Sequence, residues 1–278
     1  MKNSRKGGRI METKDEKVLK EPFAEIGRKM HLLLHTGQLL MENGADSDRT
    51  VRDMMRTAAY MGIPKDRIHQ HVMYTTLMLN VNDEQHSYTE FRKCTKHGIN
   101  MTTLTAISKL TWRALEKNYS LHEFERHLLR IKNRPRNYPV WLTALGAGAA
   151  CGGFCKLFGG SWLDLLFAFL SGIFIQLLLD AIDRCGASRV IQSAAGGALC
   201  TLLPLLFNHF TGFGLVDAIT GGLLMPLVPG LAMTNAVQDA MRGDVLSGVG
   251  HGMQAVLTAV LVAGGSVVAS RAVWTLLM

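Results

Sequence analysis

The chain has 278 residues, of which 48% are hydrophobic and 19% charged, averages that would also fit a large soluble protein. Dividing it at Tyr138 separates two very different compositions. Residues 1–138 hold 25 of the 30 Lys and Arg residues and 16 of the 22 acids, whereas residues 139–278 hold five basic residues, six aspartates and 21 of the 28 glycines. So little charge with so much glycine excludes a soluble second half and is typical of helices that pack in lipid.

The N-terminal half is predicted to be a cytoplasmic α+β domain at residues 21–135, preceded by a disordered basic tail at 1–20 that lacks a secretory signal. Apolar residues at helical spacing and N-capping residues predict four helices. Residues 71–92 are rich in β-formers around a turn-like NDEQ, which predicts a hairpin. The expected helices lie at about 22–43, 46–61, 100–117 and 120–132, with caps at Asp46 or Ser47, Asn100 and Ser120.

Two sets of side chains could bind a metal or act in catalysis, but each set can also be explained by packing or solvation alone. The five cysteines lack the spacing of a zinc site, and we interpret them as small, reduced residues that face lipid or neighbouring helices. His31 and His35 lie one helical turn apart, a spacing that metals use, but no HExxH or similar pattern accompanies them. An acid–base or metal site could be assembled from them with Glu42, Asp46, Asp48 and Arg49, yet a solvated or core-edge histidine pair is preferred, and no metal or cofactor is predicted.

Five apolar stretches follow a basic hinge, KNRPRNYP at residues 132–139, whose two prolines end the preceding helix. The basic excess adjoins these stretches, so attraction to anionic lipid headgroups explains it better than binding of nucleic acid. Each stretch is close to the length that crosses the hydrocarbon core, which predicts a polytopic α-helical membrane protein. The predicted bundle at 139–278 has spans at about 139–158, 162–180, 188–207, 214–235 and 248–270.

Basic residues gather in alternate loops, which predicts the orientation of the bundle. Six of them flank one set of span ends and two flank the other set. Because Lys and Arg are retained on the cytoplasmic side, we expect a bacterial inner-membrane protein with its N-terminus in the cytoplasm and its C-terminus outside. The six are Lys132, Arg134, Arg136, Arg184, Arg189 and Arg242, and the two are Lys156 and Arg271.

The fourth stretch carries Pro226, Pro229 and Gly230 near its centre. Each proline removes a backbone donor and clashes with the preceding turn, which leaves carbonyls free at membrane depth. Irregular backbone there is tolerated only against protein or a water-filled cavity, and discontinuous helices of this kind form midplane substrate sites in secondary transporters. A proline kink repaired by neighbouring helices is the alternative to a binding site.

Polar side chains within the spans are few, and intramembrane acids often mark ion or proton pathways. Asp180 and Asp217 lie near the ends of their spans, so each can instead face headgroups. Asn235 and Asp239 are four residues apart and share a helix face. The candidate substrate and ion pathway therefore consists of Gln176, Asp180, Asp217, Pro226, Pro229, Gly230, Asn235 and Asp239.

Several segments, in a fixed order, resemble the ThrE-type threonine/serine exporter family. They are TGQLLMENGADSDRTVRDMMRTAAYMGI, VMYTTLMLNV, the basic hinge, and a glycine-rich membrane half with MPLVPG and TNAVQDAMRGD. The resemblance covers nearly everything after residue 20. It implies an exporter of small polar metabolites, such as threonine and serine or dicarboxylates like succinate, driven by an ion gradient because the chain has no P-loop. It also singles out Glu42, Gly44 and Arg49 in the N-terminal motif and Pro226, Pro229, Gly230, Asn235 and Asp239 in the membrane motif.

In the split type of this family the spans are divided between a chain like this one and a small second membrane protein, which implies a partner subunit. Two other classes of protein stay open from the sequence. One is a membrane-anchored enzyme with a hydrolase-like N-terminal domain, and the other is a membrane sensor that binds a ligand without transporting it.

Overall fold

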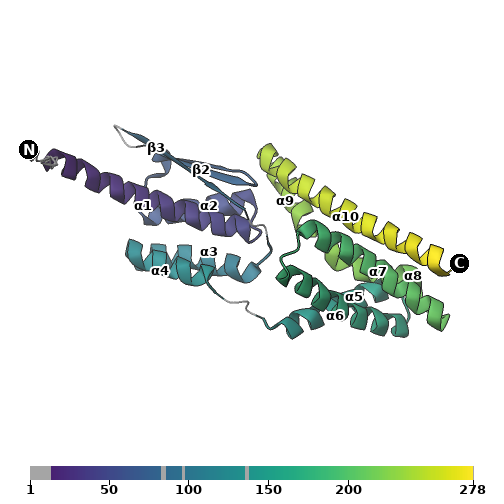
Figure 1. The fold of residues 1–278 in the computed structure, drawn as a ribbon. Helices are drawn as coiled ribbons and strands as arrows, with labels where there is room; N and C mark the ends of the chain where they lie inside the picture. Colours follow the sequence, from purple (N-terminus) through teal and green to yellow (C-terminus); the bar gives the residue numbers. More distant parts are fainter. Residues whose placement is uncertain (1–13, 83–85, 96–97, 135–137, 278) are drawn as a thin grey trace, which may run out of the picture. The chain divides into compact units, whose positions relative to one another are not determined.

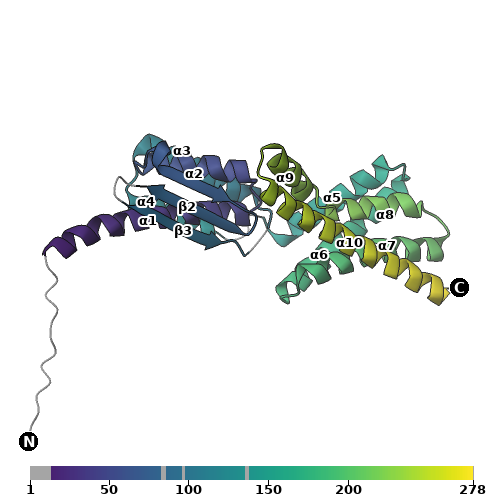
Figure 2. The same cartoon turned by 90° about the horizontal axis from the view of Figure 1, so that it is seen from above.

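A computed structural model of the chain describes residues 14–82, 86–95, 98–134 and 138–277. The chain divides into two compact units, Met1–Arg134 and Pro135–Met278. Figures 1 and 2 show the elements of both units.

The N-terminal unit is α+β and is built in three layers. A three-stranded antiparallel sheet packs on α1 and α2, and α3 and α4 pack on the far side of these two helices, as Figure 1 shows. Leu77, Leu79 and Val81 alternate along the central strand and are all buried. The elements are α1 (Lys14–Glu42), α2 (Ser47–Tyr60), the 3-10 turn η1 (Lys65–Arg67), β1 (Ile68–Val72), β2 (Thr76–Asn82), β3 (Ser87–Lys93), α3 (Met101–Lys117) and α4 (Leu121–Lys132).

Local side chains set the helix starts, as the sequence predicted. The Asp46 carboxylate accepts a hydrogen bond from the backbone N–H of Arg49 at 2.7 Å and caps α2. The Asn100 side chain caps α3, and Ser120 with Glu123 forms a reciprocal capping box at α4. Each cap satisfies backbone donors that the first helical turn leaves unpaired.

Two details of the N-terminal unit differ from the prediction. The segment HVMYTTLMLNV is two strands and not one, because Met73 and Thr76 pair through both backbone N–H groups in a tight turn between β1 and β2. The sheet order is therefore β1-β2-β3, with Ile68 opposite Val81, in place of a single hairpin. Of the expected tail, residues 1–13 lie outside the described residues, whereas 14–20 form the start of α1, since extending a formed helix is easier than nucleating one.

All the regular elements in the described residues of the second unit are helices. Four of its helices, α5, α6, α7 and α10, are long and apolar enough to cross a membrane. Helices α8 and α9 pass the same test together but are bent by 55° at their junction, so the count reaches five if this pair is one span. The elements are α5 (Val140–Leu157), α6 (Trp162–Arg184), α7 (Arg189–Thr211), α8 (Val216–Leu224), η2 (Met225–Leu227), α9 (Gly230–Met241) and α10 (Val245–Leu277).

Glycines set the closest approaches between these helices. A Cβ at Gly197 of α7 would lie 2.1 Å from the Val262 carbonyl oxygen of α10, and one at Gly265 would lie 2.0 Å from the Ala194 oxygen. Gly222 of α8 meets the α5 backbone in the same way, at 2.7 Å from the Cys151 oxygen. Because no side chain fits at these points, the glycine-rich composition is explained by backbone-to-backbone packing.

Candidate functional site

The helix is interrupted at the prolines that the sequence singled out. Helix α8 ends at Leu224, a single 3-10 turn follows, and Pro229 precedes the first residue of α9. Val228 is extended, with ψ at 127°, and its N–H bonds back to the Met225 oxygen at 3.2 Å. The two halves thus remain separate helices joined by a short non-helical segment.

The predicted pathway residues near this break fall into two groups. Pro226 and Gly230 are exposed, and a Cβ at Gly230 would have no atom within 4 Å. Asn235 and Asp239, one and two turns further along α9, are buried, with 8% and 0% of their surfaces exposed. The break therefore presents open backbone, while the polar side chains of α9 face protein.

Asp239 contacts a histidine of the next helix. The Nδ1 atom of His251 on α10 lies 3.1 Å from Asp239 Oδ2, and His251 is also buried. Ser247, one turn before His251, is buried as well. Helices α9 and α10 lie side by side in Figure 1, and four buried polar residues on them make up the buried polar cluster of this helix pair: Asn235, Asp239, Ser247 and His251.

The close contact of these two helices depends on a glycine. A Cβ at Gly248 would lie 2.9 Å from the Ala236 oxygen and 3.1 Å from the Ala240 nitrogen of α9. The backbone N–H of Asp244 also donates a hydrogen bond to the backbone carbonyl oxygen of Asp239 at 2.9 Å and closes the turn between the helices. Sequence reasoning missed His251 and Ser247, although a histidine inside an apolar span is itself a signal for function.

A second buried carboxylate in this unit was also missed. Asp164, with 2% of its surface exposed, joins Ser161 in a capping box at the start of α6. Its Oδ2 accepts the Ser161 N–H at 2.8 Å, whereas its Oδ1 has no hydrogen-bond partner among the described residues. Gly214 leaves room for it, because a Cβ there would lie 3.0 Å from Oδ1.

The other polar pathway residues predicted from the sequence lie on two other helices, α6 and α8. Gln176 and Asp180 are half-buried on α6, and Asp217 is exposed in the first turn of α8. An acid in a first turn is favourable next to the positive end of the helix dipole, which gives Asp217 a plain structural role.

Glu42 and Gly44 of the N-terminal motif hold a loop against the end of α1. Glu42 Oε1 accepts hydrogen bonds from Gln38 Nε2 at 3.0 Å and from the Thr95 N–H at 3.3 Å. Gly44 has a φ of +92°, and a Cβ there would lie 3.0 Å from the Gly98 oxygen. Both residues therefore fix the chain between β3 and α3.

Arg49 joins α2 to α3 through a serine. Its Nη2 donates to Ser108 Oγ at 3.3 Å, and Ser108 in turn donates to Oδ2 of the buried Asp53 at 2.6 Å. This places Arg49 in the packing of the N-terminal unit. Glu42, Gly44 and Arg49 thus each have a structural role in the N-terminal unit.

The two histidines of α1 lie in different surroundings. His31 is exposed beside Arg92, whose Nη2 lies 3.0 Å from His31 Nδ1. His35 is buried, and this burial, reinforced by the charges of Lys132 and Arg92, lowers the pKa of His35 to about 4. Within the described part of the chain, no three His, Cys, Asp or Glu side chains gather as a metal site would need.

Together, the apolar helices and the separate α+β unit define a polytopic helical membrane protein whose one broken helix leads into a buried polar cluster. The profile of the ThrE family of threonine/serine exporters matches residues 31–273. The chain belongs to this family, and it is a membrane transport protein.

Curated relatives carry two kinds of name. The chain is 27% identical over 227 residues to "Probable succinate transporter subunit YjjP" of Escherichia coli (strain K12), covering 78% of this chain and 84% of that protein. A Klebsiella aerogenes protein of the same name is 24% identical, with 78% and 83% covered. "Threonine/serine exporter" of Corynebacterium glutamicum is 23% identical, and the match covers 79% of this chain but 46% of that protein. No solved structure matches the chain.

Proposed function

We propose that this chain is one subunit of a secondary-active exporter of small polar metabolites, and not an enzyme. Its cargo would be amino acids of the threonine and serine type or dicarboxylates such as succinate. A second small membrane subunit would complete the exporter. The observation that carries the proposal is the buried Asp239–His251 pair placed directly after a broken helix.

The pair suits a proton-coupled mechanism. A carboxylate and an imidazole in contact can hold one proton between them as a pair with no net charge, and after release of that proton the imidazole N–H can still donate a hydrogen bond to the remaining carboxylate. Intramembrane acids and histidines serve such relays in pumps and transporters. A movement of the α9–α10 hairpin that separates Asp239 from His251 would change which of the two side chains holds a proton. Proton uptake or release would in this way be coupled to a conformational change of the transporter.

The break suits recognition of the cargo. Backbone carbonyls at the break between α8 and α9 would accept hydrogen bonds from an ammonium group of the cargo, and the N-terminus of α9 would favour a carboxylate. Amino acids carry an ammonium group and a carboxylate, and dicarboxylates carry two carboxylates. Pro226, Pro229 and Gly230 would thus shape the cargo site, while Asn235 and Asp239 would connect it to the proton pathway.

A second subunit is supported by three observations. Relatives of similar length are named as a transporter subunit. The match covers less than half of the longer Corynebacterium exporter. Pro226 and Gly230 are exposed in the single chain, and a site open on one side is what a partner subunit would close. We place the assembly in the bacterial inner membrane, with the N-terminal unit in the cytoplasm, from the distribution of basic residues.

Efflux measured in reconstituted vesicles tests this proposal. Radiolabelled threonine, serine and succinate are loaded into proteoliposomes that hold this chain, its genomic neighbour, or both, under an imposed pH gradient. We expect gradient-dependent efflux of at least one cargo when both are present. Binding of cargo without movement in any combination would instead identify a sensor. Turnover of a model ester or amide by the purified chain, with no efflux, would identify an enzyme.

A further inference from the structure

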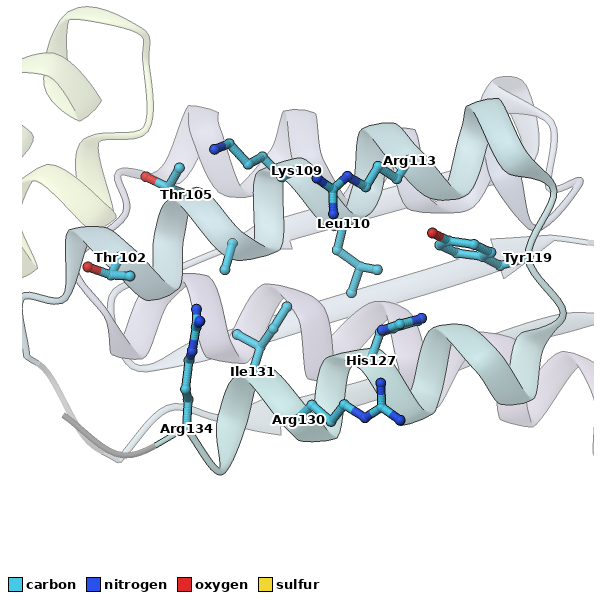
Figure 3. Close-up of a pocket in the computed structure, with 11 residues that line it drawn as sticks. Thr102, Thr105, Lys109, Leu110, Arg113, Tyr119, His127, Arg130, Ile131 and Arg134 are labelled. Carbon is cyan, nitrogen blue, oxygen red and sulfur yellow. The ribbon is translucent and has the colours of Figure 1, made fainter. Parts of the chain in front are cut away.

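A basic groove lies between α3 and α4 of the N-terminal unit. It has a volume of about 490 Å³. Figure 3 shows Lys109 and Arg113 on α3 facing Arg130 on α4 and Arg134 just beyond its end. Tyr119 and His127 stack at one end of the groove, with ring centroids 5.3 Å apart, and Thr102 lies toward the other end.

The four cations of this groove are placed as two rows of like charge. Lys109 and Arg113 are four residues apart on α3, and like charges at that spacing destabilise a helix. Arg130 and Arg134 have the same sequence spacing, but Arg134 lies beyond the end of α4. All four are exposed, and none makes an ion pair with the residues that the structure describes. The eleven residues lining the groove include no acid.

The acids of the neighbouring helix are engaged elsewhere. Glu123 closes the capping box at the start of α4, and Glu125 pairs with Arg28 of α1 at 2.7 Å. These contacts lower the pKa of both carboxyl groups, through hydrogen bonds from Ser120 and Arg28 respectively. Among the residues that the structure describes, no acid forms an ion pair with the four groove cations, although Glu116 lies one turn beyond Arg113 on α3.

We propose that this groove is a binding site for a small anion with two or more negative charges, held through phosphate or carboxylate oxygens. Guanidinium groups bind such oxygens in a bidentate manner, and two of them face Lys109 and Arg113 across the groove. The residues that line the groove all belong to the N-terminal unit, and none of them is a proposed pathway residue. The same chemistry can come from a free solute or from a lipid headgroup, since Arg134 precedes α5 by only a few residues.

Hydrogen exchange on the full chain tests the site directly. The chain is placed in nanodiscs of phosphatidylcholine, and inorganic phosphate is titrated against chloride at equal ionic strength. We expect phosphate to slow amide exchange in α3 and α4. The double variant Lys109→Gln/Arg130→Gln should raise the apparent dissociation constant for phosphate by about tenfold for each cation removed.

A matched control removes the same charges from the same helices outside the groove. Lys117→Gln/Arg126→Gln should keep the phosphate effect within about twofold of wild type, because it changes net charge equally but spares the site. Without phosphate, Lys109→Gln/Arg130→Gln should exchange no faster than wild type, since it relieves repulsion. The charge-retaining variant Arg130→Lys should keep most of the binding. Equal phosphate effects in both double variants would overturn the proposal.

A second arm separates the two sources of the anion. Nanodiscs containing phosphatidylglycerol are compared with phosphatidylcholine nanodiscs in the absence of phosphate. If the ligand is a headgroup, the anionic lipid alone protects α3 and α4, and Lys109→Gln/Arg130→Gln abolishes that protection. If the ligand is a solute, only added phosphate protects them. Protection in neither arm would reject an anion site.

Discussion

His251 Nδ1 lies 3.1 Å from Asp239 Oδ2, and this contact joins α9 to α10 inside the membrane unit. Both side chains are buried, so the pair sits where an isolated charge is costly. Gly248 allows the two helices to come close enough for the contact to form.

Asp239→Asn should leave the protein folded but lower efflux at least about tenfold, because an amide keeps the shape of the carboxylate without its proton chemistry. Residual efflux should lose its dependence on the pH gradient. Asp244→Asn, in the turn after α9, is the control and should transport normally. The same assay on Asp180→Asn and Asp217→Asn tests the acids that the sequence suggested. Unchanged gradient dependence in Asp239→Asn would remove this residue from the coupling mechanism.

Pro226→Ala/Pro229→Ala should restore a continuous helix across the break and stabilise it by up to a few kcal/mol. Efflux per folded molecule should nonetheless fall sharply, since the open carbonyls would be withdrawn into helical hydrogen bonds. Pro204→Ala is the matched control, because Pro204 lies within the continuous helix α7. Normal efflux per folded molecule in the double variant would show that the break is only a structural kink and does not bind cargo.

Reporter fusions decide whether the bent pair α8–α9 crosses the membrane. A crossing pair places a fusion at Arg242 in the cytoplasm and a fusion after Met278 outside, which is what the basic residues predict. A re-entrant pair would exchange the two locations. Alkaline phosphatase and green fluorescent protein fusions at both positions give complementary readouts, and a fusion after Arg184 is a cytoplasmic control in either case.

Gly44→Ala should destabilise the N-terminal unit by about 1–2 kcal/mol, because it places a side chain at positive φ. The added Cβ would also press on the Gly98 oxygen, 3.0 Å away. Gly27→Ala is the opposite case, since Gly27 lies within α1 with no atom near its Cβ position. That variant should stabilise the unit by about 0.5–1 kcal/mol. Exchange rates of α1 amides report both changes, and equal effects would contradict the account of Gly44.

Acid should weaken the N-terminal unit through His35. Its pKa is lowered to about 4 when folded, against about 6.5 when unfolded, so the folded state binds fewer protons. The stability that neutral His35 contributes is present above pH 6.5 and is lost as the pH falls towards 4, by about 1–3 kcal/mol. His35→Gln should flatten this part of the pH–stability curve. An equal slope in wild type and His35→Gln would show that another group dominates.

Local signals in the sequence predicted much of the fold. The caps at Asp46, Asn100 and Ser120 act within three residues of the helices they start, and apolar length alone marks a membrane span. The break at Pro226 and Pro229 is equally local, because a proline lacks its own backbone donor. The division of one β-rich segment into two strands was missed, since a tight turn at Met73–Thr76 carries no glycine or proline.

By itself, the sequence determined that the protein has two units, where its capped helices α2, α3 and α4 begin, how much of it can enter a membrane and which helix is broken. Only the tertiary structure decided that His251 meets Asp239 and that the cations of α3 and α4 face one groove. These contacts join different helices, and their geometry depends on how closely the backbones approach. Composition and periodicity describe one helix at a time, so they cannot show which side chains two helices bring together.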